Sequence, residues 1–315
     1  MRISTSVIPI ICLLSACGGS GGSSTSPTTT VPPTSNTTAF SLAVSDAPVD
    51  DATAVVVVFD SVELIGNGEP LQFSVRDEND QPMQVDLLAL QGSLFTNIVE
   101  NVEIPTGDYS QIRINVLEDS YIEMMAGTFP LEVPSGELKL DGFSAQANTT
   151  AAYTVEFDLR KSLVDPKGKP VIYLKPRGVR LVANETVGSI EGTVASSLVM
   201  NEQCADKIDP DAGNAVYLYQ GTIEDLSLLG DDADTPANPE EIAPFTTASV
   251  NFDESTQSYT YAIGFVEEGD YTLAFTCHSQ VDLPESDENA EDGFDFLQLQ
   301  AVSVMAGQTT EANME

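Results

Sequence analysis

The sequence has few of the residues that enzymes and nucleic-acid-binding proteins most often use. Its 315 residues include no tryptophan, one histidine and only 12 lysines and arginines. The single histidine, His278, leaves no ordinary Ser-His-Asp or Cys-His catalytic set, and the lack of tryptophan removes the flat indole platform on which sugars often stack. With 49 acidic residues the formal net charge is −37. Because such a chain repels phosphates, no nucleic-acid partner is expected, and the charge favours solubility, cation binding or a salty habitat.

A long apolar run is also missing at the N-terminus. The apolar stretch over residues 7–14 follows one positive charge, Arg2, and is too short to span a bilayer, which needs about 20 apolar residues. A charged start, a short apolar core and small residues before a cut site are typical of a secretory signal peptide. We therefore predict a signal peptide over residues 1–16.

The end of this segment, Leu14-Ser15-Ala16-Cys17, resembles the lipobox of bacterial lipoproteins. The resemblance implies cleavage before Cys17 and attachment of lipid, including palmitate, to its thiol, which would anchor the chain to a membrane. Gly18, rather than aspartate, follows the cysteine, and in lipoproteins this implies transport to the outer membrane. The alternative is an ordinary signal peptide with a chance cysteine.

Cysteine is scarce elsewhere. Of the four cysteines, Cys12 leaves with the signal peptide and Cys17 takes lipid, so that Cys204 and Cys277 remain. An even pair in an oxidising compartment predicts a disulfide, and closing this loop would stabilise the fold by about 4 kcal/mol on the chain-entropy model. A metal site is the weaker alternative, because the chain offers one histidine and no third cysteine.

Residues 17–38 contain mainly glycine, serine, threonine and proline. A segment of this composition cannot bury enough apolar surface to offset its ordering entropy. We predict a disordered tether over residues 17–38.

From residue 40 onward the apolar pattern has a period of two. Residues 55–59 form a β-branched run long enough for a strand buried on both faces, and residues 109–117 and 153–160 alternate apolar with polar side chains. Glycine- and proline-containing turn signals lie between the runs. The best helix candidate, residues 86–99, is interrupted by Gly92. Many short strands with regular turns predict an all-β fold built from antiparallel sandwiches.

The charge distribution changes near Asn184. Seven of the ten basic residues between positions 40 and 183 lie within residues 160–180, whereas beyond position 183 only Lys207 is basic and 27 residues are acidic. Alternating strand patterns then begin again at Ser189. We predict two antiparallel β-sandwich domains in tandem, residues 39–183 and 184–315. The basic run could contact an anionic polysaccharide or the acidic face of a partner, but we favour packing against the chain's own acidic second domain.

A short motif occurs once in each predicted domain. Gly107-Asp108-Tyr109 and Gly269-Asp270-Tyr271 each precede an alternating strand. Glycine permits the tight turn, and the tyrosine can cover the edge of a core. The motif predicts that the two sandwiches are built from similar parts.

Four stretches in the first domain together resemble the DUF4382 family, a domain of bacterial secreted lipoproteins, over about residues 38–183. The stretches are Val44-Ser45-Asp46-Ala47-Pro48-Val49-Asp50-Asp51-Ala52, Gly107-Asp108-Tyr109-Ser110-Gln111-Ile112-Arg113, Val133-Pro134-Ser135-Gly136 with Leu138-Lys139-Leu140, and Phe157-Asp158-Leu159-Arg160-Lys161-Ser162. Through Gly192-Thr193-Val194 and Gly269-Asp270-Tyr271-Thr272, the second domain is similar to transthyretin-like and carboxypeptidase-regulatory sandwiches. Neither resemblance supplies a catalytic residue.

One acidic stretch is a candidate metal site. Asp46, Asp50 and Asp51 place three carboxylates within six residues, and Ca²⁺ binds several oxygens that a turn can bring together. The alternative is that Asp46 forms an Asx-turn before Pro48 while the other carboxylates are solvated. The acidic runs 231–234 and 285–295 lack EF-hand spacing and are expected to be surface loops.

The sequence predicts a non-catalytic, lipid-anchored cell-envelope protein of the outer membrane. Its two sandwiches would present a binding or adhesive surface to a polysaccharide or a protein. One alternative is a structural or matrix component stabilised by Ca²⁺, and no other cofactor is expected. A further alternative is a hydrolase that uses paired carboxylates, as glycosidases do.

Overall fold

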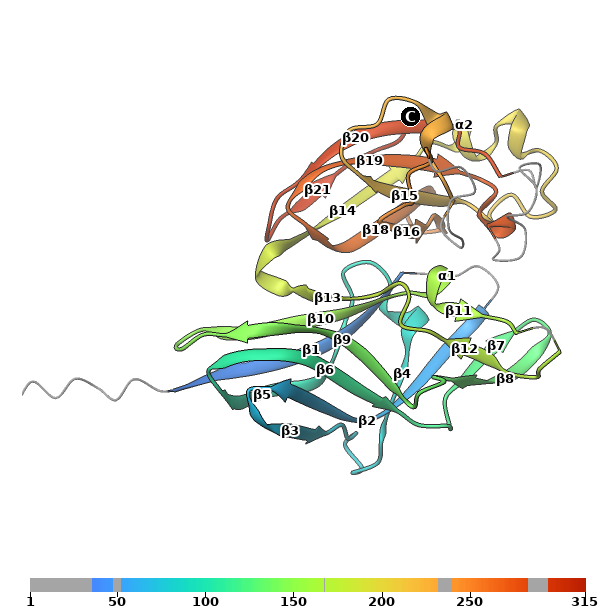
Figure 1. Cartoon of the computed structure of the whole chain (residues 1–315). Coiled ribbons are helices and arrows are strands. Elements are labelled where there is room, and N and C mark those ends of the chain that lie inside the picture. Colours follow the sequence, from blue (N-terminus) through green and yellow to red (C-terminus); the bar gives the residue numbers. More distant parts are fainter. Residues whose placement is uncertain (1–35, 48–51, 167, 232–239, 283–293) are drawn as a thin grey trace, which may run out of the picture. The chain divides into compact units, whose positions relative to one another are not determined.

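The computed structural model describes residues 36–47, 52–166, 168–231, 240–282 and 294–315. Strands dominate these residues, and the two α-helices, α1 (Leu159–Ser162) and α2 (Ser196–Val199), have four residues each (Figure 1). The predicted all-β class is confirmed. Within the described ranges, no helix is long and apolar enough to cross a membrane. The predicted signal peptide and Cys17 lie outside the described residues.

Two sheets form the first sandwich. The smaller sheet has the order β13 (Val179–Ala183), β10 (Thr150–Asp158), β1 (Thr37–Ala47), β5 (Thr96–Pro105). The nine-stranded sheet runs β11 (Leu163–Val164), β12 (Ile172–Leu174), β8 (Gly127–Glu132), β7 (Tyr121–Met124), β2 (Ala52–Gly66), β6 (Gly107–Val116), β9 (Glu137–Ala145), with β3 (Gly68–Ser74) and β4 (Met83–Asp86) also paired to β2. Apolar side chains of both sheets share one core. Residues 55–59 of β2 are all buried, as their unbroken apolar run predicts.

Two four-stranded sheets form the second sandwich. One has the order β17 (Asn251–Asp253), β18 (Ser258–Glu267), β14 (Val187–Val194), β21 (Thr309–Glu311), and the other β16 (Thr246–Ser249), β15 (Ala215–Gln220), β19 (Gly269–Thr276), β20 (Gln298–Val304). Their buried side chains form a second core, from Ile190 to Met314. Short 3-10 turns complete the described elements: η1 (Leu87–Leu90), η2 (Asn184–Thr186), η3 (Glu202–Cys204), η4 (Leu226–Leu228) and η5 (Ser279–Val281). The division into domains at residue 184 stays a prediction, since both sandwiches belong to one compact unit, Ser35–Glu315.

Among the described strands most pairs are antiparallel, as predicted, but three are parallel. They are β1 with β10, β8 with β12 and β14 with β21. The members of each pair are far apart in sequence and are not joined by a hairpin. Alternation of apolar residues fixes which side of a strand faces the core, but it does not fix the direction of a distant partner strand.

The helix candidate over residues 86–99 does not form a helix of that length. Asp86 caps only the short turn η1, because its carboxylate accepts hydrogen bonds from the backbone N–H of Leu88 at 3.2 Å and of Val55 at 3.1 Å. Gly92 then takes the left-handed backbone conformation with a φ of +68°. From Thr96 the chain continues as β5, which pairs with β1.

The predicted tether, residues 17–38, overlaps the first strand by two residues. Strand β1 begins at Thr37, and Thr38 is buried opposite Ile104 of β5. The Thr38 hydroxyl donates a hydrogen bond to the carbonyl oxygen of Thr149. Threonine suits a pleated, half-buried surface as well as a polar linker, so composition alone does not mark this boundary.

The repeated Gly-Asp-Tyr motif makes the same contacts in both sandwiches. Each tyrosine hydroxyl donates to a carbonyl oxygen four residues upstream, Tyr109 to Pro105 at 2.9 Å and Tyr271 to Glu267 at 3.0 Å. Each aspartate accepts a hydrogen bond from a serine of the neighbouring strand, Ser144 for Asp108 and Ser303 for Asp270. The motif therefore locks the start of β6 and of β19 in the same way, as expected for sandwiches built from similar parts.

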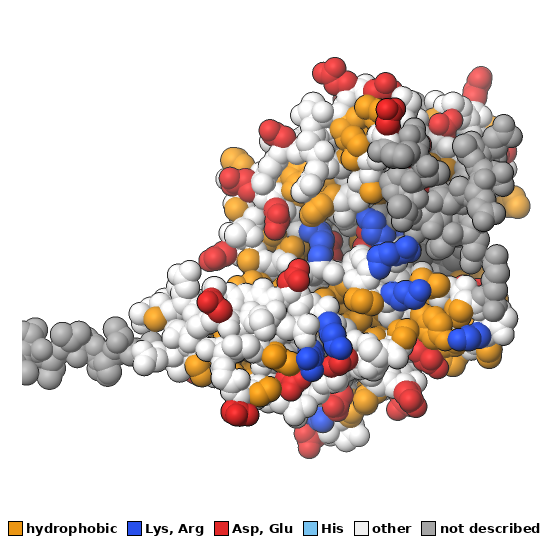
Figure 2. Space-filling view, in the orientation of Figure 1, with side chains coloured by type: hydrophobic (Ala, Val, Ile, Leu, Met, Phe, Trp, Pro, Cys, Tyr) orange, Lys and Arg blue, Asp and Glu red, His pale blue; other side chains and the backbone are white. Residues whose placement is uncertain are grey.

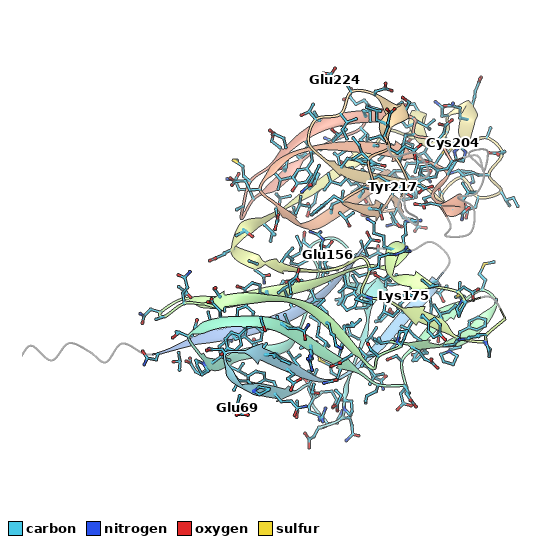
Figure 3. The ribbon with its side chains drawn as sticks, in the orientation of Figure 1. Glu69, Glu156, Lys175, Cys204, Tyr217 and Glu224 are labelled. Carbon is cyan, nitrogen blue, oxygen red and sulfur yellow. A yellow bond between two sulfur atoms is a disulfide. The ribbon has the colours of Figure 1, made fainter. Side chains whose placement is uncertain are left out.

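The predicted disulfide is confirmed. Cys204 of η3 is bonded to Cys277, which follows β19, with a Cα–Cα distance of 5.9 Å. Both residues are buried in the second core, and Figure 3 shows the position of Cys204. The bond joins residues that are 73 apart in sequence.

Candidate binding groove

The outer face of the sheet β17–β18–β14–β21 carries short polar side chains. Successive residues of a strand point to opposite faces, so Glu191 and Thr193 of β14 point away from the core that Ile190 and Val194 help to form. In the antiparallel register, Thr193 lies opposite Thr260 of β18. The result is a floor on which hydroxyl, amide and carboxylate groups lie among the small apolar surfaces of Gly192 and Ala262.

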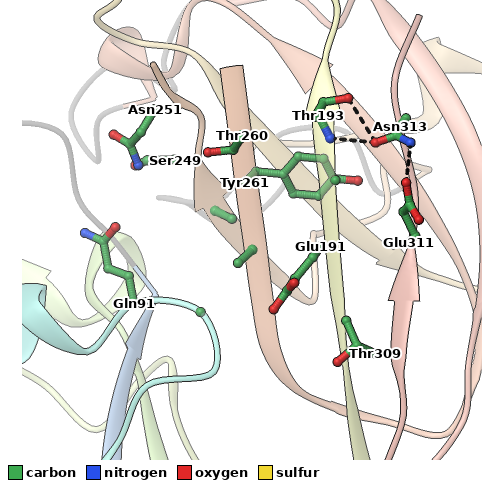
Figure 4. A pocket seen from close by; sticks show the side chains of 14 residues that line it. Gln91, Glu191, Thr193, Ser249, Asn251, Thr260, Tyr261, Thr309, Glu311 and Asn313 are labelled. Atoms are coloured by element: carbon green, nitrogen blue, oxygen red, sulfur yellow. Dashed lines mark hydrogen bonds between the residues drawn. The ribbon is translucent and has the colours of Figure 1, made fainter. Parts of the chain in front are cut away.

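A loop of the first sandwich forms a wall over this floor. Gln91 and Gly92, which lie between η1 and β5, approach β18 closely. A Cβ atom built on Gly92 would lie 2.9 Å from the Cβ of Ala262, and one built on Gly264 would lie 2.1 Å from the carbonyl oxygen of Gly92. Glycine at both positions therefore permits contact between the backbones. The hollow between wall and floor, which we call the polar groove, has a volume of about 670 Å³ (Figure 4).

Hydrogen bonds hold one end of the polar groove in a fixed arrangement. The Oδ1 atom of Asn313 accepts from both the backbone N–H and the hydroxyl of Thr193, each at 2.9 Å. The Nδ2 atom of Asn313 donates to Glu311 Oε1 at 2.9 Å, and these bonds appear as dashed lines in Figure 4. Tyr261 supports the floor, because its buried hydroxyl donates to the carbonyl oxygen of Ala312 at 2.7 Å. Burial raises the pKa of Tyr261 well above its ordinary value, so this hydroxyl stays protonated at neutral pH.

The polar groove is acidic. Glu191 and Glu311 are register partners on the neighbouring parallel strands β14 and β21, and both side chains line the groove. None of the described residues that line it is lysine, arginine or histidine. The groove therefore offers hydrogen-bond acceptors and hydroxyl groups to a ligand and disfavours an anionic one.

The structure places Asp46, a predicted Ca²⁺ ligand, inside strand β1 rather than in a loop. Its side chain is buried, and neither carboxylate oxygen has a hydrogen-bond partner. Burial, reinforced by the nearby carboxylates of Asp158, Glu156 and Asp86, raises the pKa of Asp46 well above its ordinary value. Because the carboxylate accepts no hydrogen bond, the alternative of an Asx-turn at Asp46 is not observed.

The other two predicted Ca²⁺ ligands, Asp50 and Asp51, lie outside the described residues. Among the residues that are described, no group of three histidine, cysteine, aspartate or glutamate side chains could hold a metal ion. The Ca²⁺ site at Asp46, Asp50 and Asp51 stays a prediction. The acidic runs 231–234 and 285–295 also fall largely outside the described ranges.

Members of the basic run contact the second sandwich. Arg160 donates to the carbonyl oxygen of Ser279 at 3.0 Å, Lys161 to that of Pro244 at 2.9 Å and Arg180 to that of Phe265 at 3.2 Å. Figure 2 shows lysine and arginine side chains gathered where the two sandwiches meet. This agrees with the favoured prediction of internal packing, although these contacts are made to backbone carbonyl groups.

Two carboxylates of β10 accompany these cations. Glu156 forms an ion pair with Arg180, and Asp158 lies 3.2 Å from the ammonium group of Lys161. Burial raises the pKa of Glu156 to about 7, against the opposing effect of Arg180. The Arg180 guanidinium also lies 4.2 Å from the ring centroid of Phe245, which is part of the second sandwich. The first sandwich therefore supplies both the cations and their counter-charges at this junction.

The polar groove could not be found from a sequence motif, because its residues come from separated strands and one loop. Threonine, asparagine and glutamate at these positions look like ordinary exposed strand residues. The available signal is Gly264, a glycine within the strand β18, since an isolated glycine in a strand often marks close approach of another backbone. Gly92, which interrupts an apolar run, is its partner in that approach.

Comparison with known proteins gives one family match, in the first sandwich. Residues 37–176 match the family model described as domain of unknown function DUF4382. The comparison with curated proteins gives no match.

Several solved structures show a low similarity to the chain. The Bacillus anthracis TIE protein is 10% identical with a TM-score of 0.19, and the match covers 88% of this chain and 34% of that protein. The minor pilin GBS52 of Streptococcus agalactiae is 11% identical with a TM-score of 0.20, covering 88% and 94%. The fimbrial anchor protein Mfa2 of Porphyromonas gingivalis is 10% identical with a TM-score of 0.18, covering 85% and 99%. The chain thus spans about a third of the TIE protein, and residues 37–176 of its first sandwich are similar to the DUF4382 family.

Proposed function

We propose that this chain is a non-catalytic, lipid-anchored protein of the bacterial cell envelope that binds a partner in the polar groove. The observation that carries this proposal is the groove itself, an open hollow of about 670 Å³ with a floor of short, outward-facing polar side chains. The close approach of Gly92 and Gly264 holds the wall against the floor. A preformed site of this kind loses little side-chain entropy on binding.

The anchor in this proposal is Cys17. The motif Leu14-Ser15-Ala16-Cys17 supports cleavage and lipid attachment there, and Gly18 supports a location at the outer membrane. Mass spectrometry of the mature N-terminus is expected to show a lipid-modified cysteine. An unmodified thiol at position 17 would remove the anchor from the proposal.

We also propose residues 39–183 and 184–315 as the two domains. Each of the two main apolar cores falls within one of these ranges, and the short turn η2 (Asn184–Thr186) separates β13 from β14. The resemblance of the second range to transthyretin-like sandwiches remains part of this proposal. Limited proteolysis is expected to cleave close to residue 184, and a first cut within either core would contradict the division.

Retention on envelope material tests the proposed function. We would incubate residues 18–315, which lack the proposed lipid anchor but include the whole compact unit Ser35–Glu315, with envelope fragments from cells that lack the protein and measure the bound fraction. The variant Thr260→Trp fills the polar groove from its floor, whereas the control Thr128→Trp adds the same ring at an exposed position of β8. Wild type and Thr128→Trp should be retained and Thr260→Trp should not. Equal retention of all three proteins, or of none, would refute groove-dependent binding.

A second candidate function is a structural component stabilised by Ca²⁺. The observation that favours it is the buried carboxylate of Asp46, since an unpartnered buried carboxylate is costly unless it is protonated or binds a cation. Calorimetry with Ca²⁺ and then with a chelator tests this function. A melting temperature that does not change between the two conditions would rule it out.

A further inference from the structure

We propose that the polar groove binds an extended, uncharged oligosaccharide. This inference rests on the proposed function and names the class of ligand for the same groove. The length of the groove, its hydrogen-bonding groups and its charge each help to decide which class of ligand fits.

The length of the site exceeds that of a single sugar. At one end the polar groove shares Thr309 with a hollow of about 200 Å³ that Phe95 and Phe265 help to line. At the other end it shares Gln91, Ser249 and Asn251 with a hollow of about 210 Å³. The three hollows therefore adjoin one another through shared residues, and a row of adjoining hollows suits a chain-like ligand.

The groups along this path match the hydroxyl groups of sugars. Threonine and serine hydroxyls donate and accept hydrogen bonds, amides do both through separate atoms, and carboxylates accept two or more. A sugar ring carries adjacent hydroxyls that can satisfy these groups in pairs. Because Thr193, Asn313 and Glu311 are already held by hydrogen bonds to one another, the acceptors are positioned before a ligand arrives.

The same features disfavour a peptide. An extended peptide gains most of its affinity by adding a strand to a sheet edge, but the floor of the polar groove is a sheet face. Protein partners are usually anchored by aromatic or aliphatic side chains in apolar pockets. Apart from Ala248, Ala262 and Tyr261, the described lining residues are glycine or carry hydroxyl, amide or carboxylate groups. The geometry therefore favours a hydroxyl-rich ligand.

Charge selects the kind of oligosaccharide. Glu191 and Glu311 line the polar groove, Asp211 lines the adjoining hollow, and the described lining residues include no basic side chain. Uronic acids and sulfated sugars would be repelled, and the net charge of the chain adds to that repulsion. An uncharged sugar meets no such penalty, and its hydroxyls can donate to the carboxylates.

One aromatic ring adds an apolar contact at the end of the path. Phe95 is 50% exposed although its ring packs edge-on against Phe265, with ring centroids 6.2 Å apart. An exposed aromatic ring beside a polar groove offers an apolar face to the C–H groups of a sugar. This contact partly replaces the tryptophan platform that the sequence lacks.

The test treats the envelope fragments before the same anchor-free protein, residues 18–315, is added. Periodate cleaves the vicinal diols of sugars, and proteinase K removes proteins. Retention of the wild type should fall at least tenfold after periodate and stay unchanged after proteinase K. An uncharged hexasaccharide fraction released from the fragments should compete for retention, and the acidic fraction should not.

Two substitutions connect the result to the groove. Glu191→Gln keeps the shape of the side chain and removes an ionised acceptor. We therefore expect that about ten times more of the uncharged hexasaccharides is needed to compete with retention of this variant. Glu123→Gln makes the same change at an exposed position of β7 and should have no effect.

The outcomes separate this inference from the proposed function. If retention depends on Thr260 but is abolished by proteinase K, or if only acidic or amino-sugar fractions compete, the oligosaccharide inference is overturned and groove binding stands. If retention does not depend on Thr260, both are overturned. If shortened oligosaccharides were recovered after incubation, the protein would hydrolyse its ligand, and the proposal of non-catalytic binding would be wrong.

Discussion

A methyl group at position 264 provides a direct structural test of the contact between the two sandwiches. In Gly264→Ala the new Cβ atom would lie 2.1 Å from the carbonyl oxygen of Gly92, 2.7 Å from its carbonyl carbon and 3.0 Å from the Cα of Ser93. All three are backbone atoms, so no side-chain rotation can relieve the overlap. The Gly92 carbonyl oxygen must move by about 1 Å or more, and overpacking of this kind costs about 1–3 kcal/mol.

We expect Gly264→Ala to lower the free energy of unfolding by that amount and to weaken retention on envelope fragments, because the wall of the polar groove shifts. Gly269→Ala is the matched control, since its new methyl group would meet only the Tyr271 ring, at an ordinary distance of 3.4 Å. Urea unfolding followed by fluorescence measures both variants. If Gly264→Ala unfolds at the same urea concentration as Gly269→Ala, the described contact is incorrect.

Three further predictions concern buried groups. The pKa of Glu156 rises to about 7 in the folded protein, so its contribution to stability is complete below about pH 4.5 and is lost as the pH rises toward 7. Urea unfolding should show that the difference in unfolding free energy between wild type and Glu156→Gln changes by about 3 kcal/mol over this pH range. A difference that stays constant with pH would contradict this prediction. If Asp46 binds Ca²⁺, calcium should raise the melting temperature of the wild type but not of Asp46→Asn, and equal shifts would exclude Asp46 as a ligand. The double variant Cys204→Ser/Cys277→Ser should lose about 4 kcal/mol of unfolding free energy in urea, and an unchanged midpoint would show that the bond does not stabilise the fold.

Local alternation predicted the strands well because each sandwich buries one side of most strands. In β6, the residues Ile112, Ile114 and Val116 are buried while their neighbours are more exposed, as the period of two requires. The repeated tyrosines, Tyr109 and Tyr271, were similarly predictable, since each lies directly after a turn and at the start of an alternating strand.

Features that depend on distant segments were not predictable in the same way. The parallel pairing of β1 with β10 joins residues more than 100 positions apart, and nothing in either strand specifies that direction. The segment around Leu87 has an apolar pattern that fits a helix, yet the capping bonds of Asp86 and the left-handed Gly92 limit it to one short turn.

The polar groove was missed for a related reason. Thr193, Thr260 and Asn313 become neighbours only when β14, β18 and the segment after β21 lie side by side. Their chemistry is ordinary for exposed strands, so composition gives no warning that they share a concave surface. The disulfide was predictable because elimination left only Cys204 and Cys277.

The most direct test of the central claim is amide hydrogen exchange of the full-length protein, measured with and without bound envelope fragments. Binding in the polar groove predicts slower exchange in the peptides that contain Thr193 and Thr260, with unchanged exchange in β8. Slower exchange confined to other strands, or no change in the β14 and β18 peptides, would contradict the assignment of the groove as the binding site.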